Sequence, residues 1–266
     1  MFWNELLSVW WMAPLAVAIG MIGTLIGAGG GFILMPILLL LYAGDPQKTP
    51  QNLTAISLAM VFANAVSGTM SYARMKRIDY RSGIAFAAAG LPGAVIGRYL
   101  ITMIGPFFNI LFGSLMLIGS LFLMYKGLRQ QKKTPQRQPA SPSSLRYNLT
   151  LGMTISFGVG LLASMLGIGG GIIHVPFMIY ALNFPVHFAT ATSHFVLVFV
   201  CGTSVAVDLW HGVLQPGLPT AICLSLGVIP GAILGAKLSK KIHGRWIVIT
   251  LAGALLGVAM RILMRN

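Results

Sequence analysis

The chain has 266 residues, of which 56% are hydrophobic and only 8% are charged. Because a soluble domain carries roughly 25% charged residues, this composition excludes a soluble globular protein and indicates an integral membrane protein with little soluble mass. The 18 Lys and Arg residues outnumber the 4 Asp and Glu residues. Most of them lie in short loops between apolar segments, so they indicate positive-inside topology and not nucleic-acid binding.

The apolar segments predict an all-α polytopic membrane protein. In chain order they fall at about 10–26, 31–43, 53–73, 83–104, 106–125, 148–166, 170–183, 188–209, 218–238 and 246–263. A segment at 126–147, rich in Pro, Ser and basic residues, separates a first transmembrane repeat at 1–125 from a second at 148–266. We expect this linker to be cytoplasmic and to lack regular structure.

Two of the apolar regions carry the same glycine-rich motif. Residues 26–36 read IGAGGGFILMP, and residues 166–176 read LGIGGGIIHVP, 140 positions later. Glycines cost a helix about 1 kcal/mol each and proline about 3 kcal/mol, and irregular backbone survives at membrane depth only where protein or a water-filled cavity satisfies it. A matched pair of such breaks predicts a transporter binding site. Its glycines are Gly29, Gly30, Gly31, Gly169, Gly170 and Gly171.

Two further blocks support an internal duplication. Residues 91–97 read LPGAVIG and residues 229–235 read IPGAILG, 138 positions apart, and 52–57 aligns loosely with 189–193 at an offset of 136. The two motif copies are not identical, since Ile168 and His174 replace Ala28 and Leu34.

We expect the following prolines and glycines to serve packing or hinge motion: Pro36, Pro92, Gly93, Pro176, Pro230 and Gly231.

The distribution of charge favours two inverted-topology repeats. If each glycine-broken region is a helical hairpin that returns to its starting face, each repeat has this hairpin plus three transmembrane helices. The basic clusters at 74–81, 126–146 and 237–245 then share one side. Arg261 and Arg265 lie outside in this arrangement, an exception that the positive-inside rule tolerates. The alternative, parallel 4+4 repeats with each broken region as one span, does not place all three clusters in the cytoplasm.

The length of the hairpin arms agrees with this arrangement. Arms of about 17 and 13 residues make roughly 25 and 20 Å of helix, which is short for a bilayer core of about 30 Å.

The chemistry of the motif favours an anionic substrate. Cation transporters usually need buried carboxylates, and of the acidic residues Glu5, Asp45, Asp79 and Asp208 we expect only Asp208 within a span. A helix that begins just after a glycine triplet presents unpaired N–H groups and the positive end of its dipole, which bind anions without a charged side chain. In the inverted arrangement, two such helix ends converge on one central site.

Small polar residues that follow each break are suitable oxyanion donors. They are Asn52, Thr54, Ser57 and Asn64 in the first repeat, and Thr190, Thr192, Ser193 and His194 in the second. The alternative is ordinary interhelical hydrogen bonding, worth about 0.6 kcal/mol per bond.

His194 and the two charged residues near span ends, Arg98 and Asp208, admit more than one interpretation. His194 and Asp208 are candidates for proton coupling, although an interfacial role also fits Asp208, and Arg98 fits a snorkelling position. We expect no metal site, because the histidines lack the close spacing and the cysteine or carboxylate partners of one, and no other cofactor. Cys201 and Cys223 lie in apolar segments, and we expect no disulfide.

The chain resembles the TauE/SafE family. The resemblance rests on the paired Gly-x-Gly-Gly-Gly breaks with a proline five positions later, on the Thr- and Ser-rich segments after them, and on the Pro-Gly-Ala-x-x-Gly blocks. It covers nearly the whole chain outside the linker, and it implies a multi-pass permease of the bacterial inner membrane that exports sulfite or a sulfonate such as sulfoacetate. The implied partners are a small anionic substrate and membrane lipid.

We therefore expect a secondary transporter that works by alternating access, and not an enzyme. An importer, an exchanger or a channel for related small anions is the alternative. A membrane-embedded enzyme is disfavoured, because the sequence has no nucleophile–base pair or metal cluster with diagnostic spacing.

Overall fold

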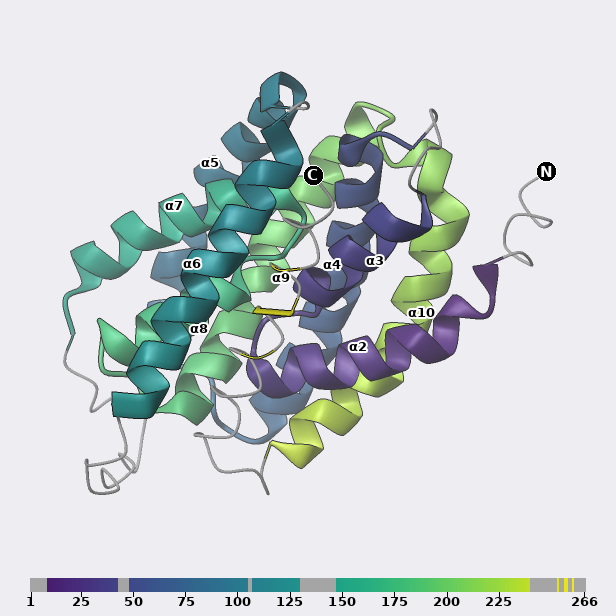
Figure 1. Cartoon of the computed structure of the whole chain (residues 1–266). Coiled ribbons are helices and arrows are strands. Elements are labelled where there is room, and N and C mark those ends of the chain that lie inside the picture. Colours follow the sequence, from purple (N-terminus) through teal and green to yellow (C-terminus); the bar gives the residue numbers. More distant parts are fainter. Residues whose placement is uncertain are drawn as a thin grey trace.

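The structure, a computed structural model, describes residues 9–42, 48–104, 107–129 and 147–239, and the single residues 253, 256, 257 and 260. In order, the helices of these residues are α2 (Met12–Ile26), α3 (Gly31–Leu41), α4 (Pro50–Arg74), α5 (Tyr80–Ile104), α6 (Phe108–Arg129), α7 (Leu149–Leu166), α8 (Gly171–Tyr180), α9 (Val186–Trp210), the short 3-10 turn η4 (Gln215–Gly217) and α10 (Leu218–Leu238) (Figure 1). The prediction of an all-α chain is confirmed for these residues.

The linker predicted at 126–147 lies mostly outside the described residues. The helix α6 continues to Arg129, four residues into that segment, and Tyr147 is the first described residue after it. The last apolar segment, 246–263, and most of the basic cluster at 237–245 also lie outside the described residues.

Helices α4 and α9 lie at the centre of the described structure. They pack against each other, α4 also packs against α10, and α5 packs against both α9 and α7. The helix α2 lies along α10, at the side of the molecule opposite α5 and α7 (Figure 1). The main contacts correspond between the repeats: α5 with α7 corresponds to α10 with α2, and α5 with α9 corresponds to α10 with α4.

The outer helix pairs pack through glycines. A Cβ atom on Gly93 or Gly97 of α5 would collide with the backbone carbonyl of Phe157 or Leu161 of α7, so the two backbones touch directly. Small residues allow such close approach between membrane helices. The equivalent glycines of α10 lie against α2 in the same way: Gly231 against Val17, and Gly235 against Met21. Pro92 and Pro230, which precede two of these glycines, lie inside α5 and α10.

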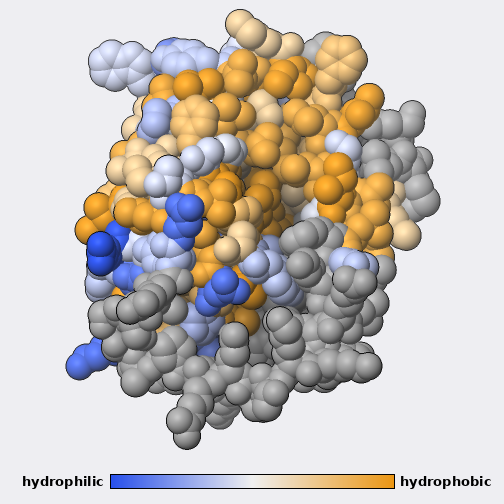
Figure 2. Space-filling view, turned by 90° about the vertical axis from the view of Figure 1, so that its left-hand side faces the viewer, coloured by the Kyte–Doolittle hydropathy of each residue, from blue (hydrophilic) through white to orange (hydrophobic). Residues whose placement is uncertain are grey.

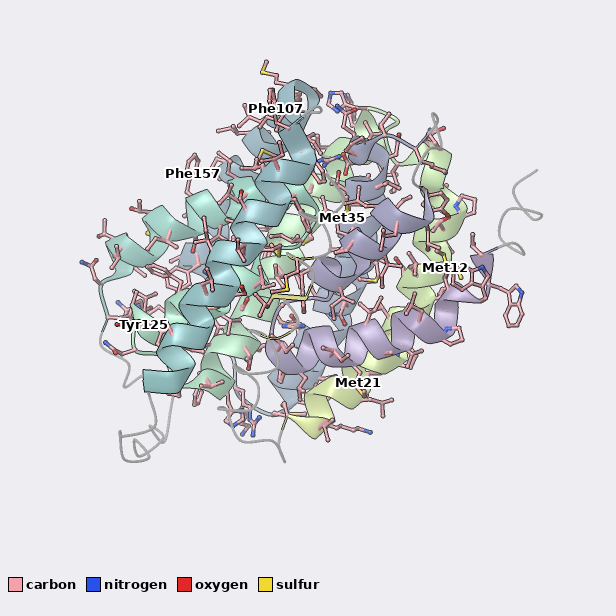
Figure 3. All side chains as sticks on the ribbon, viewed as in Figure 1. Met12, Met21, Met35, Phe107, Tyr125 and Phe157 are labelled. Carbon is pink, nitrogen blue, oxygen red and sulfur yellow. The ribbon has the colours of Figure 1, made fainter. Side chains whose placement is uncertain are left out.

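Five helical segments are long and apolar enough to cross a membrane: α4, α5, α7, α9 and Gln215–Leu238. Apolar side chains cover much of the face shown in Figure 2, and hydrophilic side chains gather toward one end of it. Phe107 and Tyr125 are 65% and 53% exposed, whereas Met12 and Met35 are buried inside the protein (Figure 3). This surface identifies a multi-pass membrane protein, because a soluble protein rarely exposes so large an apolar area.

Helices α2, α3 and α8 are shorter than the spans, with 15, 11 and 10 residues. Both ends of the α2–α3 region lie near the start of α10. Cys223 Sγ lies 3.4 Å from the carbonyl oxygen of Val9, which precedes α2. Lys48 Nζ, which follows α3, donates to the carbonyl oxygen of Pro216. In the second repeat, the rings of Tyr147 and Phe184, which flank α7 and α8, lie 4.9 Å apart. Each glycine-broken region therefore folds back on itself.

Candidate functional site

The two glycine breaks meet at the centre of the protein. The first lies between Ile26 and Gly31, and the second between Leu166 and Gly171. A Cβ atom added to Gly31 would lie 2.7 Å from the carbonyl oxygen of Gly167, and one added to Gly171 would collide with Gly27. Two segments 140 residues apart therefore touch backbone to backbone, where no side chain fits.

Left-handed backbone conformations end one helix and begin the next at each break. Gly27 and Gly167, with φ of 87° and 71°, cap the ends of α2 and α7. Gly30 and Gly170, with φ of 87° and 83°, precede the first residues of α3 and α8. A residue with a Cβ is strained at such angles, so the sequence needs glycine there to reverse the chain inside four residues.

The first N–H groups of α3 and α8 differ from those farther along each helix in their hydrogen bonding. In α3, the N–H groups of Ile33 and Leu34 donate to the carbonyl oxygen of Gly30, and in α8 those of residues 173 and 174 donate to Gly170. The N–H groups before them have no acceptor among the described residues: Gly30, Gly31 and Phe32 in one repeat, and Gly170, Gly171 and Ile172 in the other. Unpaired N–H groups at a helix start are an anion-binding arrangement.

Two predicted site serines hold the breaks in place. Ser57 Oγ on α4 donates a hydrogen bond of 2.6 Å to the carbonyl oxygen of Gly167, and Ser193 Oγ on α9 donates one of 3.1 Å to that of Gly27. All four residues are buried. Ser57 and Ser193 occupy equivalent positions, so each repeat supplies the hydroxyl that satisfies the break of the other.

Two predicted threonines also lie against the breaks. The Cα atoms of Thr190 and Thr54 would lie 2.8 and 2.9 Å from a Cβ atom added to Gly27 and Gly167, respectively. Their hydroxyls donate to carbonyl oxygens one turn earlier in their own chain segments. They form the wall of the central region next to the glycines.

Asn52 and Thr192 lie in the first two turns of the central helices α4 and α9. Asn52 belongs to the capping box of α4, and its Nδ2 donates to the carbonyl oxygen of Val213 at 2.9 Å. Thr192 Oγ1 accepts from the N–H of Asp79 at 3.0 Å. The structure thus brings the serines and Thr54 and Thr190 to the breaks, but joins Asn52 and Thr192 to loops.

Asn64 and His194 are buried beside the first break with spare hydrogen-bonding capacity. Asn64 Oδ1 accepts from Thr24 Oγ1 at 2.8 Å, while Asn64 Nδ2 and both ring nitrogens of His194 have no partner among the described residues. The ring of Tyr72 meets His194 edge-on at 5.6 Å, and its hydroxyl donates to the carbonyl oxygen of Thr24, three residues before Gly27. Buried polar atoms without partners are rare, so this cluster is suited to a polar ligand or water.

The other described histidines have protein partners. His174, inside the second motif, has its Nε2 3.0 Å from Ser156 Oγ and packs edge-on against Phe86. His211 is exposed at the end of α9, with Nδ1 2.9 Å from the carbonyl oxygen of Val207. Among the residues that the structure describes, no group of three or more His, Cys, Asp or Glu side chains is placed to hold a metal ion.

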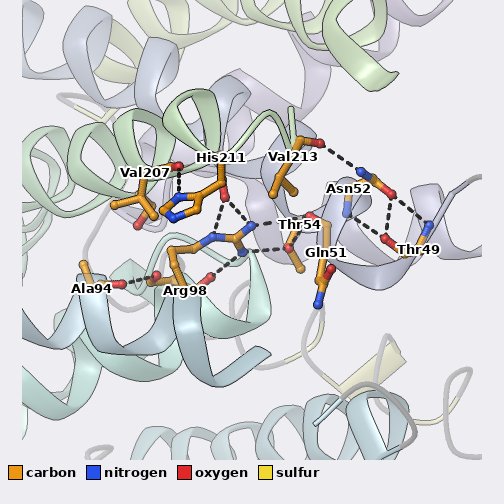
Figure 4. Close-up of polar contacts among 12 residues, drawn as sticks. Thr49, Gln51, Asn52, Thr54, Ala94, Arg98, Val207, His211 and Val213 are labelled. Atoms are coloured by element: carbon orange, nitrogen blue, oxygen red, sulfur yellow. Dashed lines mark hydrogen bonds and ion pairs between the residues drawn. The ribbon is translucent and has the colours of Figure 1, made fainter. Parts of the chain in front are cut away.

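The snorkelling position predicted for Arg98 is wrong. Arg98 is only 5% exposed, and its Nε donates to Asp208 Oδ1 at 2.7 Å, so the two charges form a buried pair (Figure 4). Asp208 is also buried, with 2% of its surface exposed. The sequence contained a signal for this pair, since one basic and one acidic residue each lie in an apolar segment. Buried charges require partners, so the two residues could have been paired.

Arg98 also reaches the central region. Its Nη1 donates to Thr54 Oγ1 at 2.9 Å and to the carbonyl oxygen of Ser164 at 3.3 Å (Figure 4). Sequence reasoning named Thr54 as a site residue but did not connect Arg98 to it.

Comparisons with known proteins find one matching family and several relatives named as probable membrane transporters. The family described as "Sulfite exporter TauE/SafE" matches residues 12–262. The chain is 31% identical over 244 residues to "Probable membrane transporter protein YunE" of Bacillus subtilis, covering 87% of each chain. It is 27% identical over 251 residues to "Probable membrane transporter protein MJ0441" of Methanocaldococcus jannaschii, covering 90% of this chain and 89% of the relative. No solved structure matches the chain.

Proposed function

The chain belongs to the sulfite exporter TauE/SafE family, and on that premise we propose that it is a secondary transporter that carries a small sulfur oxyanion out of the cytoplasm by alternating access. Its relatives' names describe membrane transporters, not enzymes. Sulfite, or a sulfonate such as sulfoacetate, is the proposed substrate. The observation that carries the proposal is the meeting of two glycine breaks whose N–H groups lack acceptors among the described residues.

The binding chemistry suits an oxyanion. Two helix N-termini each contribute free N–H groups and the positive end of a dipole. Asn64 Nδ2 adds a side-chain donor, and His194 adds one in either neutral tautomer. Such donors hold a tetrahedral or pyramidal oxyanion without needing a lysine at the centre. An inside-negative potential favours export by about 2.3 kcal/mol per charge per 100 mV.

The proposed arrangement of the repeats is inverted. In support, the start of α4 lies beside the end of α9, where Asn52 contacts Val213, and the end of α4 lies beside the start of α9, where Asp79 contacts Thr192. The equivalent helices α4 and α9 are therefore antiparallel. Each glycine-broken region also returns to its starting end, as an inverted repeat requires.

The direct test of this function is flux of labelled sulfite into proteoliposomes, with sulfate, sulfoacetate and chloride as competitors. We expect saturable, counterflow-competent uptake of sulfite that sulfoacetate inhibits. The Asn64→Val variant should lose most of this flux, because it removes the buried Nδ2 donor. The substitution suits the fold, since the equivalent position in the second repeat, Val200, already holds valine. Ser114→Ala, which removes a hydroxyl bonded only within α6, is the matched control.

Two outcomes would contradict the proposal. Absence of labelled-sulfite flux, and of labelled-sulfoacetate flux in the same assay, with folded wild-type protein would remove sulfur oxyanions as substrates. Non-saturable flux without counterflow would indicate a channel and not alternating access.

A further inference from the structure

The ion pair between Arg98 and Asp208 is mismatched for a structural salt bridge. Arg98 Nε and Nη2 both approach the same carboxylate oxygen, Asp208 Oδ1, at 2.7 and 2.5 Å. The second oxygen, Oδ2, is buried without a partner among the described residues. A stable guanidinium–carboxylate pair usually uses two parallel hydrogen bonds to two oxygens. The pair as built leaves a buried acceptor unsatisfied, which weakens it.

Only the side chain of Thr54 separates Arg98 from the second glycine break. Arg98 Nη1 donates to Thr54 Oγ1, and Thr54 itself packs directly against Gly167. The carbonyl oxygen of Ser164, the other acceptor of Nη1, lies three residues before that glycine. A permanent positive charge therefore stands at one end of the proposed anion site, currently neutralised by Asp208.

The opposite end of the site shows that the fold does not need this charge. Ala236 is the repeat equivalent of Arg98, and Tyr72 is the equivalent of Asp208. These two residues also pack together, in one small buried cluster. The Tyr72 hydroxyl donates to the carbonyl oxygen of Thr24, just as Arg98 donates to the equivalent carbonyl of Ser164.

A neutral pair therefore closes one end of the centre, and a charged pair closes the other. Replacing a buried ion pair by well-packed neutral residues is often neutral or stabilising, so stability alone does not explain the charges.

We propose that Arg98 is a charge-selecting ligand for the transported anion, and that Asp208 takes the place of the anion when the site is empty. This inference rests on the proposed transport of an oxyanion. An oxyanion offers two oxygens to the guanidinium fork, which the carboxylate of Asp208 does not do here. When the substrate displaces the carboxylate of Asp208 from Arg98, this end of the site opens. The positive charge of Arg98 gives the transporter its preference for anions.

Binding by purified protein in detergent tests the proposal independently of flux. Dissociation constants for sulfite and sulfate are obtained from anion-dependent shifts of the unfolding temperature, for wild type, Asp208→Asn and the double variant Arg98→Gln/Asp208→Asn. Asp208→Asn should bind sulfite about three- to ten-fold more tightly, because the anion no longer competes with a carboxylate. The double variant should bind about ten-fold or more weakly, as the loss of a hydrogen bond to a charged partner predicts.

A merely structural pair gives the opposite pattern. In that case, the double variant binds like wild type and Asp208→Asn binds worst, because it leaves a buried arginine unpaired; this result would overturn the inference while leaving the transporter proposal intact. Absence of any anion effect on wild type would overturn both. Ser156→Ala, which removes the buried partner of His174, controls for lost stability and should keep the wild-type dissociation constant.

The inference remains testable if the double variant does not fold. Arg98→Lys keeps the charge but loses the planar fork, and it should weaken sulfite binding more than chloride binding, since chloride makes no two-oxygen contact. Equal effects on both anions would contradict the proposed role of the fork.

Discussion

Ser57 of α4 donates its hydroxyl hydrogen to the carbonyl oxygen of Gly167, a residue of the other repeat that is 110 positions away. Ser193 makes the equivalent bond to Gly27. A break in a membrane helix leaves carbonyl groups without their helical donors, and no water of the bilayer core satisfies them. The two repeats thus satisfy each other's broken backbone, so neither glycine break is complete in one repeat alone.

Removal of this hydroxyl should destabilise the centre. Ser57→Ala leaves the buried carbonyl oxygen of Gly167 without its donor, and we expect the free energy of unfolding to fall by about 1–3 kcal/mol. Thermal unfolding in detergent measures the effect. Ser114→Ala, whose hydroxyl bonds only to the carbonyl oxygen of Leu111 in its own helix, should change stability by less than about 0.5 kcal/mol. Equal losses in the two variants would show that the bond between the repeats adds nothing.

A methyl group at the second break should be poorly tolerated. Gly170→Ala places a Cβ at φ of 83° and 2.8 Å from Cβ of Ala163, and the left-handed backbone alone costs about 1–2 kcal/mol. Gly158→Ala on α7 is the matched control, because a Cβ there meets nothing within 4 Å. We expect Gly158→Ala to raise stability by up to about 1 kcal/mol, since alanine is the better helix former. Similar unfolding temperatures for the two variants would contradict the break geometry.

Single-cysteine labelling should place residues 81 and 211 on opposite sides of the membrane. Arg81→Cys and His211→Cys are each introduced after Cys201 and Cys223, both buried and free, have been replaced by alanine. Both labelled positions are exposed. Inverted repeats predict that a membrane-impermeant thiol reagent reaches position 211 from outside and position 81 only after the membrane is opened. Parallel repeats put both positions on the same side, so equal labelling would favour that alternative.

His194 should support both binding and proton coupling. His194→Leu introduces the residue that occupies the equivalent position in the first repeat, Leu58, and removes two buried ring nitrogens without partners among the described residues. We expect sulfite flux to fall about ten-fold, as the loss of a hydrogen bond to an anion predicts. The remaining flux should no longer respond to an imposed pH gradient. Flux that keeps its full pH response would assign coupling to another group, and Asp208→Asn in the same assay tests the other candidate.

The sequence by itself determined the helices and the position of the two breaks. Long apolar segments specify membrane helices wherever they occur, and glycine triplets with a following proline disfavour a continuous helix whatever surrounds them. Both effects depend on neighbouring residues, so they can be read locally. The duplication was also visible, because equivalent residues keep their order.

Only the tertiary structure decided which polar residues lie at the breaks. Asn52 and Ser57 follow the same glycines in sequence, yet Asn52 bonds to the loop after α9 and Ser57 bonds to the glycine break of the opposite repeat. Arg98 is buried because Asp208, 110 positions away, lies opposite it, whereas an arginine at the same helical position without that partner would extend toward water. Propensity and hydropathy depend on near neighbours, but the partner of a buried polar group is fixed by which distant helix packs beside it.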